Sequence, residues 1–137
     1  FQDVSAVIYI AALSSFDQKL MEDESVNRMA EAIALFSAIC NHPLFKSIGM
    51  IVFLNKIDLF QQKIKTVQIS EYFPDYAGDF YNEGSQYFVD RFEELNKYTE
   101  RTVYFHLTWA TDTQQISDVF LLVRDLVIQI NLKFLSL

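Results

Sequence analysis

The chain is poor in glycine, proline and cysteine. Its 137 residues include three glycines, two prolines and one cysteine. None of the glycines, Gly49, Gly78 and Gly84, falls in a G-x-x-x-x-G-K-[ST] motif, so the sequence has no recognisable loop for cradling phosphate groups. The single cysteine, Cys40, excludes an intramolecular disulfide and favours a reducing compartment.

Excess positive charge and long apolar runs are also missing. The net charge of -7 argues against a nucleic-acid-binding protein, which needs a basic surface to neutralise phosphates. No apolar run reaches the roughly 18 residues that a membrane span requires. The start, Phe1–Val4, lacks the initiator Met, the basic region and the cleavage site of a signal peptide. We therefore expect the chain to be part of a longer protein.

Three short apolar runs stand out, at Val4–Ala12, Ile48–Leu54 and Val103–Trp109. Each is rich in β-branched or aromatic residues, and none alternates cleanly between apolar and polar positions. Continuous runs of this length are typical of strands that are buried on both faces of a parallel sheet.

Segments with helical spacing lie between and after these runs. The first has apolar residues at steps of three and four, namely Val26, Met29, Ile33, Phe36 and Cys40. Asn41 and Pro43 predict the end of this helix. A second helix is predicted over Gly84–Lys97, and a third from about Gln114 to the C-terminus.

The alternation of strands and helices predicts an α/β fold with a doubly wound, mostly parallel sheet and helices on both faces. In such sheets, ligands bind beyond the carboxyl ends of the strands. The loops after Leu13, Asn55 and Thr108 are therefore the places where functional residues are expected.

The second of these loops reads Asn55-Lys56-Ile57-Asp58, directly after a predicted strand. Guanine presents two donors on one edge, N1–H and the N2 amine, and the two oxygens of Asp58 can accept both. Adenine lacks these donors and would leave the carboxylate unpaired. Asn55 can donate to the base N7 and tie neighbouring loops together, while the stem of Lys56 can lie along the base with its ammonium in solvent. The motif also suits an ordinary turn after a strand.

The third loop, Thr108–Thr111, leads from the last strand towards the C-terminal helix. The small side chain of Ala110 would let its backbone N–H approach the base carbonyl O6, and that donor would reject the amino group of adenine. The alternative is a capped strand-to-helix turn, with Thr108 and Thr111 as its polar residues.

Seven stretches carry a resemblance to a known family. In order they are Ala11–Asp17, Glu22–Met29, Leu54–Phe60, Tyr76–Gly78, Phe92–Lys97, Ala110–Thr113 and Asn131–Lys133. Together they make the chain similar, over essentially its whole length, to the C-terminal part of a heterotrimeric G-protein alpha subunit of the P-loop GTPase family. Residues 1–137 would then be the C-terminal portion of a single Ras-like GTPase domain, without the first strands and the phosphate loop.

The resemblance implies a guanine site at Asn55, Lys56 and Asp58, with Ala110 donating its backbone N–H. It implies GTP and GDP as ligands and GTPase activity in the longer protein. The catalytic Arg, the water-positioning Gln and the Mg²⁺ ligands of the family lie upstream of the matching segment, so no catalytic or metal-binding residue is assigned here.

The expected partners are a beta-gamma dimer, an effector and a G-protein-coupled receptor that contacts the C-terminal helix at about Gln114–Leu137. Effectors or receptors are also expected at the loops after Leu13 and around Tyr76–Tyr81. The family's peripheral location at the cytoplasmic face of the plasma membrane is expected by resemblance alone.

Two positions depart from the family. Trp109 stands where a Cys is usual, and it could stack beside the base or crowd it. The C-terminal tail ends in Ser136-Leu137 without the Cys that a bacterial toxin modifies in many members.

Three further expectations concern the chain as a whole. In the family's sheet order, the strand at Val4–Ala12 would lack a neighbour here, so the chain alone should aggregate and bind GDP weakly or not at all. An alternative function is a non-enzymatic interaction domain derived from this fold, acting through its C-terminal helix. An unrelated receiver domain is disfavoured, because Ala11–Leu13 offers no acidic cluster at a strand end.

Overall fold

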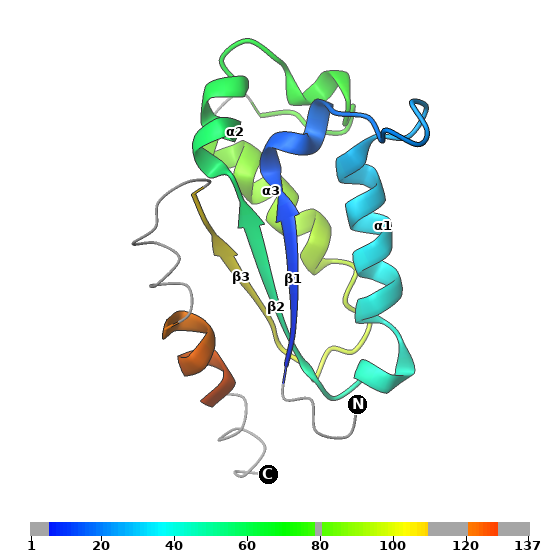
Figure 1. Cartoon of the computed structure of the whole chain (residues 1–137), viewed down its shortest axis with the longest axis vertical. Helices are drawn as coiled ribbons and strands as arrows, with labels where there is room; N and C mark the ends of the chain where they lie inside the picture. The colour runs from blue at the N-terminus through cyan, green and yellow to red at the C-terminus, as the bar shows by residue number, and fades with distance from the viewer. Residues whose placement is uncertain (1–5, 79–80, 110–120, 129–137) are drawn as a thin grey trace.

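The computed structural model describes residues 6–78, 81–109 and 121–128, and within them it contains a parallel sheet. The strands are β1 (Ala6–Ala12), β2 (Gly49–Asn55) and β3 (Val103–Leu107), hydrogen-bonded in the order β1-β2-β3 (Figure 1). All three predicted strands are confirmed, and their described ends differ from the predicted ones by at most two residues, while the predicted start at Val4 lies outside the described residues. The predicted α/β class with a parallel sheet is therefore correct.

The central strand explains why the apolar runs do not alternate. Six of the seven residues of β2 are buried, because side chains on both of its faces are covered. Met50, Val52 and Leu54 belong to the main core, whereas Ile51 and Phe53 point to the opposite face. Among the described residues β1 pairs only with β2, and Ile8 and Ile10 on it are 47% and 65% exposed.

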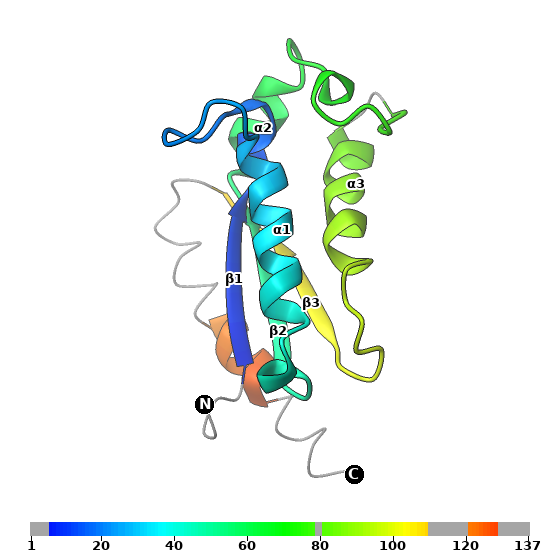
Figure 2. The ribbon, with the colours of Figure 1, turned by 90° about the vertical axis from the view of Figure 1, so that its right-hand side faces the viewer.

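Two helices cover the face of the sheet that carries the main core (Figure 2). Helix α1 (Arg28–Cys40) begins after Asn27, whose Oδ1 accepts a hydrogen bond from the Ala30 backbone N–H at 3.0 Å. It ends before Asn41, as predicted. The predicted helical stripe is confirmed, because Met29, Ile33, Phe36 and Cys40 are its buried residues.

Helix α3 (Tyr81–Glu93) lies beside α1 (Figure 2) and begins and ends earlier than the predicted Gly84–Lys97. The early end has a physical cause in side chains that bind the backbone beyond Glu93. The Asn41 carboxamide accepts from the Lys97 N–H at 2.9 Å and donates to the Leu95 carbonyl at 2.8 Å. These bonds compete with helical hydrogen bonding and turn the chain towards β3.

Aromatic side chains fill the space between the sheet and these helices. The Phe36 ring lies 5.3 Å from Tyr9 of β1 and 5.4 Å from Phe92 of α3. Near the carboxyl ends of the strands, the Phe60 ring packs edge-on against Phe16 at 5.6 Å and Phe88 at 6.1 Å. The tilted and edge-on arrangements are those that aromatic quadrupoles favour.

Four short elements were not predicted. They are the α-helix α2 (Ile57–Lys63) and the 3-10 helices η1 (Leu13–Asp17), η2 (Pro43–Phe45) and η3 (Ile69–Glu71). Each has seven residues or fewer, too few for a helical apolar period to be read with certainty and too few for a helix to form without tertiary contacts.

The predicted C-terminal helix is described only in part. Residues 121–128 are helical and lie on the side of the sheet opposite α3 (Figure 2), in agreement with helices on both faces. The remainder of the predicted Gln114–Leu137 helix, and with it Ala110, lies outside the described residues.

Candidate guanine-binding site

The parallel register brings the expected loops to one edge of the sheet. Asn55, the last residue of β2, is aligned with Ala12 at the end of β1, and Leu54 is aligned with Leu107 at the end of β3. Thr108 therefore begins a loop directly beside Asn55. The prediction that these loops share the carboxyl edge of the sheet is confirmed.

Asn55 and Thr108 fasten two of the loops to each other. The Thr108 hydroxyl donates to Asn55 Oδ1 at 2.8 Å, and Thr108 is 6% exposed. Backbone bonds support this contact, because the Thr108 N–H donates to the Leu54 carbonyl and the Ile57 N–H to the Thr108 carbonyl, both at 3.0 Å. With Oδ1 accepting this bond, the Nδ2 end of the Asn55 amide carries the donors suited to a base nitrogen.

Lys56 makes the sharp turn between β2 and α2. Its φ of 63° and ψ of 40° place it in the left-handed region, which costs a residue with a side chain about 1 kcal/mol. The turn lets α2 begin at Ile57, immediately after the strand. The Lys56 side chain is exposed, as expected of an ammonium left in solvent.

Asp58 is the second residue of α2 and is half-buried. A carboxylate in the first turn of a helix is favoured by the aligned backbone dipoles. The helix is fixed beneath it by Phe60, which is fully buried against Phe16 and Phe88. The carboxylate therefore belongs to a short helix whose position is set by packing.

The neighbouring loop is described only as far as Trp109. The Trp109 side chain is 56% exposed, so a large apolar ring lies partly in solvent next to the Thr108 anchor. The predicted nucleotide contacts of Asn55, Lys56, Asp58 and Ala110 stay predictions.

One contact that positions this region was missed from the sequence. Lys63, the last residue of α2, forms an ion pair with Asp17 of η1 at 2.7 Å. The two are 46 residues apart, and no local spacing could have paired them. The expectation that Asn55 ties neighbouring loops together is confirmed by its bond to Thr108, although the sequence did not identify this partner, which lies 53 residues away.

Several other polar or reactive side chains have ordinary structural roles. Cys40 is fully buried, and burial raises the pKa of its thiol. His42 is an exposed loop residue whose Nδ1 accepts from the Leu44 N–H at 3.1 Å. His106 packs edge-on to Phe53 at 5.8 Å, and partial burial lowers its pKa from the ordinary value. Glu22–Glu24 are exposed, as expected of solvent-facing charges.

The described residues contain neither a metal-binding cluster nor a membrane-spanning helix. Residues 6–78, 81–109 and 121–128 contain no cluster of three His, Cys, Asp or Glu side chains that could hold a metal ion. Within those ranges, every helix is too short or too polar to cross a bilayer.

Known proteins match the chain over nearly all of its length. The family model of the G-protein alpha subunit matches residues 1–127. A guanine nucleotide-binding protein alpha-1 subunit from Mycosarcoma maydis is 49% identical over 134 residues, which cover 97% of this chain and 38% of that protein. An alpha-3 subunit from Caenorhabditis elegans is 48% identical over the same shares.

A guanine nucleotide-binding protein subunit alpha from Colletotrichum trifolii is 44% identical over 138 aligned positions, covering all of this chain and 39% of that protein. The chain thus spans less than two fifths of the length of these relatives. Because the family model covers far more than half of the chain and the observed α/β fold suits part of a P-loop GTPase domain, the chain belongs to the G-protein alpha subunit family of GTP-binding signal transducers.

Proposed function

We propose that this chain supplies the guanine-recognition part of an alpha subunit that alternates between GDP-bound and GTP-bound states. The observation that carries the proposal is the pairing of the loops after β2 and β3 by the 2.8 Å bond between Thr108 and Asn55. That bond joins the loop with the guanine-reading Asp58 to the loop that continues into Ala110. Two loops held together in this way can contact one base from two sides.

In the proposed site, each residue has a separate chemical task. The Asp58 carboxylate accepts from N1–H and the N2 amine, and Asn55 Nδ2 donates to N7. The Ala110 N–H donates to O6, and the Lys56 stem lies along the base plane. These residues bind the base and perform no bond-making step.

The reaction proposed for the full-length protein is hydrolysis of GTP to GDP and phosphate. Mg²⁺ would neutralise charge on the phosphates during that reaction. No residue of this chain is assigned to the metal or to catalysis. The proposed contribution of the chain is to bind the base and so orient the nucleotide. The partners proposed from the family are a beta-gamma dimer, an effector and a receptor at the C-terminal helix, at the cytoplasmic face of the plasma membrane.

Base selectivity tests this proposal directly. The full-length product of the gene would be loaded with a fluorescent GDP analogue and titrated with unlabelled GDP or ADP. We expect ADP to displace the analogue roughly 10⁴-fold less effectively than GDP, because adenine leaves the Asp58 carboxylate unpaired. Equal displacement by the two nucleotides would contradict guanine recognition. A full-length product that binds neither would favour the non-enzymatic interaction domain.

GDP binding by the 137-residue chain alone is a second test of the proposal. We expect it to bind GDP weakly or not at all, because nothing in its sequence assigns a site for the phosphates. Isothermal titration calorimetry would measure this binding, and a micromolar or tighter dissociation constant would show that the base contacts suffice.

A further inference from the structure

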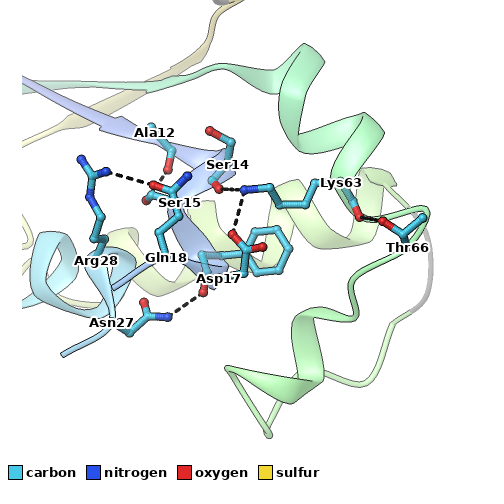
Figure 3. Close-up of polar contacts among 10 residues, drawn as sticks. Ala12, Ser14, Ser15, Asp17, Gln18, Asn27, Arg28, Lys63 and Thr66 are labelled. Atoms are coloured by element: carbon cyan, nitrogen blue, oxygen red, sulfur yellow. Dashed lines mark hydrogen bonds and ion pairs between the residues drawn. The ribbon is translucent and has the colours of Figure 1, made fainter. Parts of the chain in front are cut away.

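Lys63 is the last residue of α2, and its ammonium points into the turn that follows β1 (Figure 3). Its Nζ lies 2.7 Å from Asp17 Oδ1 and donates to the Ser14 carbonyl at 2.6 Å. The same ammonium lies 5.9 Å from the centre of the Phe16 ring. Three neighbouring groups of η1 therefore surround one cation.

This ion pair is shielded from solvent. The side chains of Lys63 and Asp17 are 23% and 17% exposed. Ion pairs on open surfaces contribute little because water screens them and both side chains lose entropy. A shielded pair with an additional carbonyl acceptor holds its geometry more firmly, since breaking it leaves a charge without its partner.

The contact matters because α2 is short and carries Asp58. Seven residues do not form a stable helix without tertiary contacts, so those contacts set where the helix lies. At its first residue, the Ile57 N–H is bonded to the Thr108 carbonyl, and in its middle Phe60 packs against Phe16. At its last residue, Lys63 is bonded to η1. Asp58 lies about 7.5 Å along the helix axis from Lys63, between the two polar attachments.

The turn that receives Lys63 is itself attached to the start of α1. The Asn27 carboxamide donates to the Phe16 carbonyl at 2.6 Å, and the Arg28 N–H donates to the Gln18 carbonyl at 2.8 Å. Figure 3 shows Arg28 and Gln18 also joined through their side chains, at 3.0 Å. Through this turn, Lys63 connects α2 to a helix that is packed on the sheet.

We infer that Lys63 is a positioning residue for base recognition, acting with Asp17 and the Ser14 carbonyl to hold Asp58 against the guanine edge. The inference rests on the proposed function. Lys63 acts through Asp58, and its loss would let the C-terminal end of α2 shift away from η1. Small displacements of a bidentate hydrogen-bonding partner weaken both bonds together.

The N2 amine of guanine offers a selective readout. Inosine diphosphate lacks this amine and is otherwise the same ligand, so the ratio of its dissociation constant to that of GDP measures how well Asp58 engages the amine. A merely structural role for Lys63 would weaken both nucleotides equally and leave the ratio unchanged. We expect a ratio of about ten in the unaltered protein, from one charge-assisted hydrogen bond.

The experiment measures this ratio in the full-length product and in the variants Lys63→Met, Asp17→Asn and their combination. Each single variant should lower the ratio about threefold, and the double variant should lower it no further, because both changes remove one interaction. Lys63→Arg, which keeps the charge, should restore most of the ratio. Lys65→Met is the matched control, because Lys65 is exposed and its ammonium donates to Gln62 on the same segment at 3.4 Å.

The outcomes separate this inference from the proposed function. The unaltered protein could show the expected ratio of about ten and keep it in both Lys63→Met and Asp17→Asn. That result would overturn the positioning role of Lys63 and leave the proposed function standing. A ratio of one in the unaltered protein would remove the proposed function, and the inference with it. Thermal unfolding of each variant shows which are folded, and Asp17→Asn, which keeps the shape of the side chain, decides the matter if Lys63→Met does not fold.

Discussion

The two ends of the parallel sheet are held together in different ways. At the amino ends of the strands, one buried arginine binds the surrounding backbone from the inside. At the carboxyl ends, the loops are joined by separate hydrogen bonds and one ion pair, and polar side chains remain partly exposed between them. Both ends belong to the same three strands, so the difference comes from the segments that connect the strands to the helices.

The amino end is centred on Arg101, which is 7% exposed. Its guanidinium donates to three backbone carbonyls, those of Cys40 at 2.7 Å, Phe45 at 3.0 Å and Ile48 at 3.2 Å. It also donates to Asn96 Oδ1 at 2.8 Å. Every donor is directed inward to the protein, so this end serves the fold.

At the carboxyl end, the polar side chains are held by protein contacts on one side and are accessible on the other. Thr108 holds the oxygen of Asn55 while the amide nitrogen is the end suited to a ligand. Lys56 keeps a strained left-handed backbone and an exposed side chain. Strain and exposed polar groups at strand ends are typical of ligand sites. The contrast supports the proposal that one end of the sheet serves stability and the other ligand recognition.

The largest expected effect comes from removing the arginine. Arg101→Met keeps an apolar stem but removes the buried guanidinium that donates to three backbone carbonyls, so we expect the free energy of unfolding to fall by about 3 kcal/mol or more. Urea denaturation of the full-length product, followed by circular dichroism, would measure it. Lys97→Met, which removes an exposed charge from the same loop, is the control. A loss of less than 1 kcal/mol for Arg101→Met would contradict the asymmetry between the two ends.

A smaller effect is expected from Thr108→Val. This change removes the hydroxyl that orients Asn55 and should weaken GDP binding by about fivefold, the equivalent of about 1 kcal/mol. Its effect on unfolding should be smaller than that of Arg101→Met. Fluorescence titration with a GDP analogue measures the binding, and Thr66→Val, at an exposed hydroxyl bonded to the Lys63 carbonyl, is the matched control. Unchanged GDP affinity in Thr108→Val would show that the loops are aligned by other contacts.

The smallest effect on stability is expected from the hydrogen bond between Tyr87 of α3 and Asp75. The Tyr87 hydroxyl donates to the Asp75 carboxylate at 2.6 Å. Burial is the larger cause and this bond the second cause that together raise the pKa of Tyr87 to about 12. The same bond lowers the pKa of Asp75. Because the tyrosine is favoured neutral and the carboxyl charged, their contribution is present between about pH 4 and pH 10. It is lost as pH falls below the ordinary carboxyl range or rises from 10 towards 12.

Tyr87→Phe removes that bond and tests the pH dependence. The melting temperature of the variant should lie slightly below that of the unaltered protein at pH 7, and the difference should shrink as the pH is lowered below 4. Differential scanning fluorimetry across this range would measure it. A difference that persists unchanged at pH 3 would mean that the stability comes from ring packing and not from the bond to Asp75.

The sequence predicted the parts of the molecule that depend on local patterns. Continuous apolar runs marked the three strands, although only β2 is buried on both faces, and the spacing from Met29 to Cys40 marked α1. The loops that meet at the carboxyl edge followed from the strand order alone. Tertiary contacts could not be predicted from local patterns. The bond from Lys63, which holds α2, and the bond from Arg101 to Cys40 join residues that are 46 and 61 positions apart.

The identity of the base reader is the central claim of this account. Asp58→Asn in the full-length product tests it most directly, by comparing the dissociation constants of GDP and xanthosine diphosphate. An asparagine can donate to the xanthine carbonyl at C2 and accept from N1–H, so we predict a change of preference from guanine to xanthine. Retained preference for guanine in this variant would contradict the assignment of Asp58.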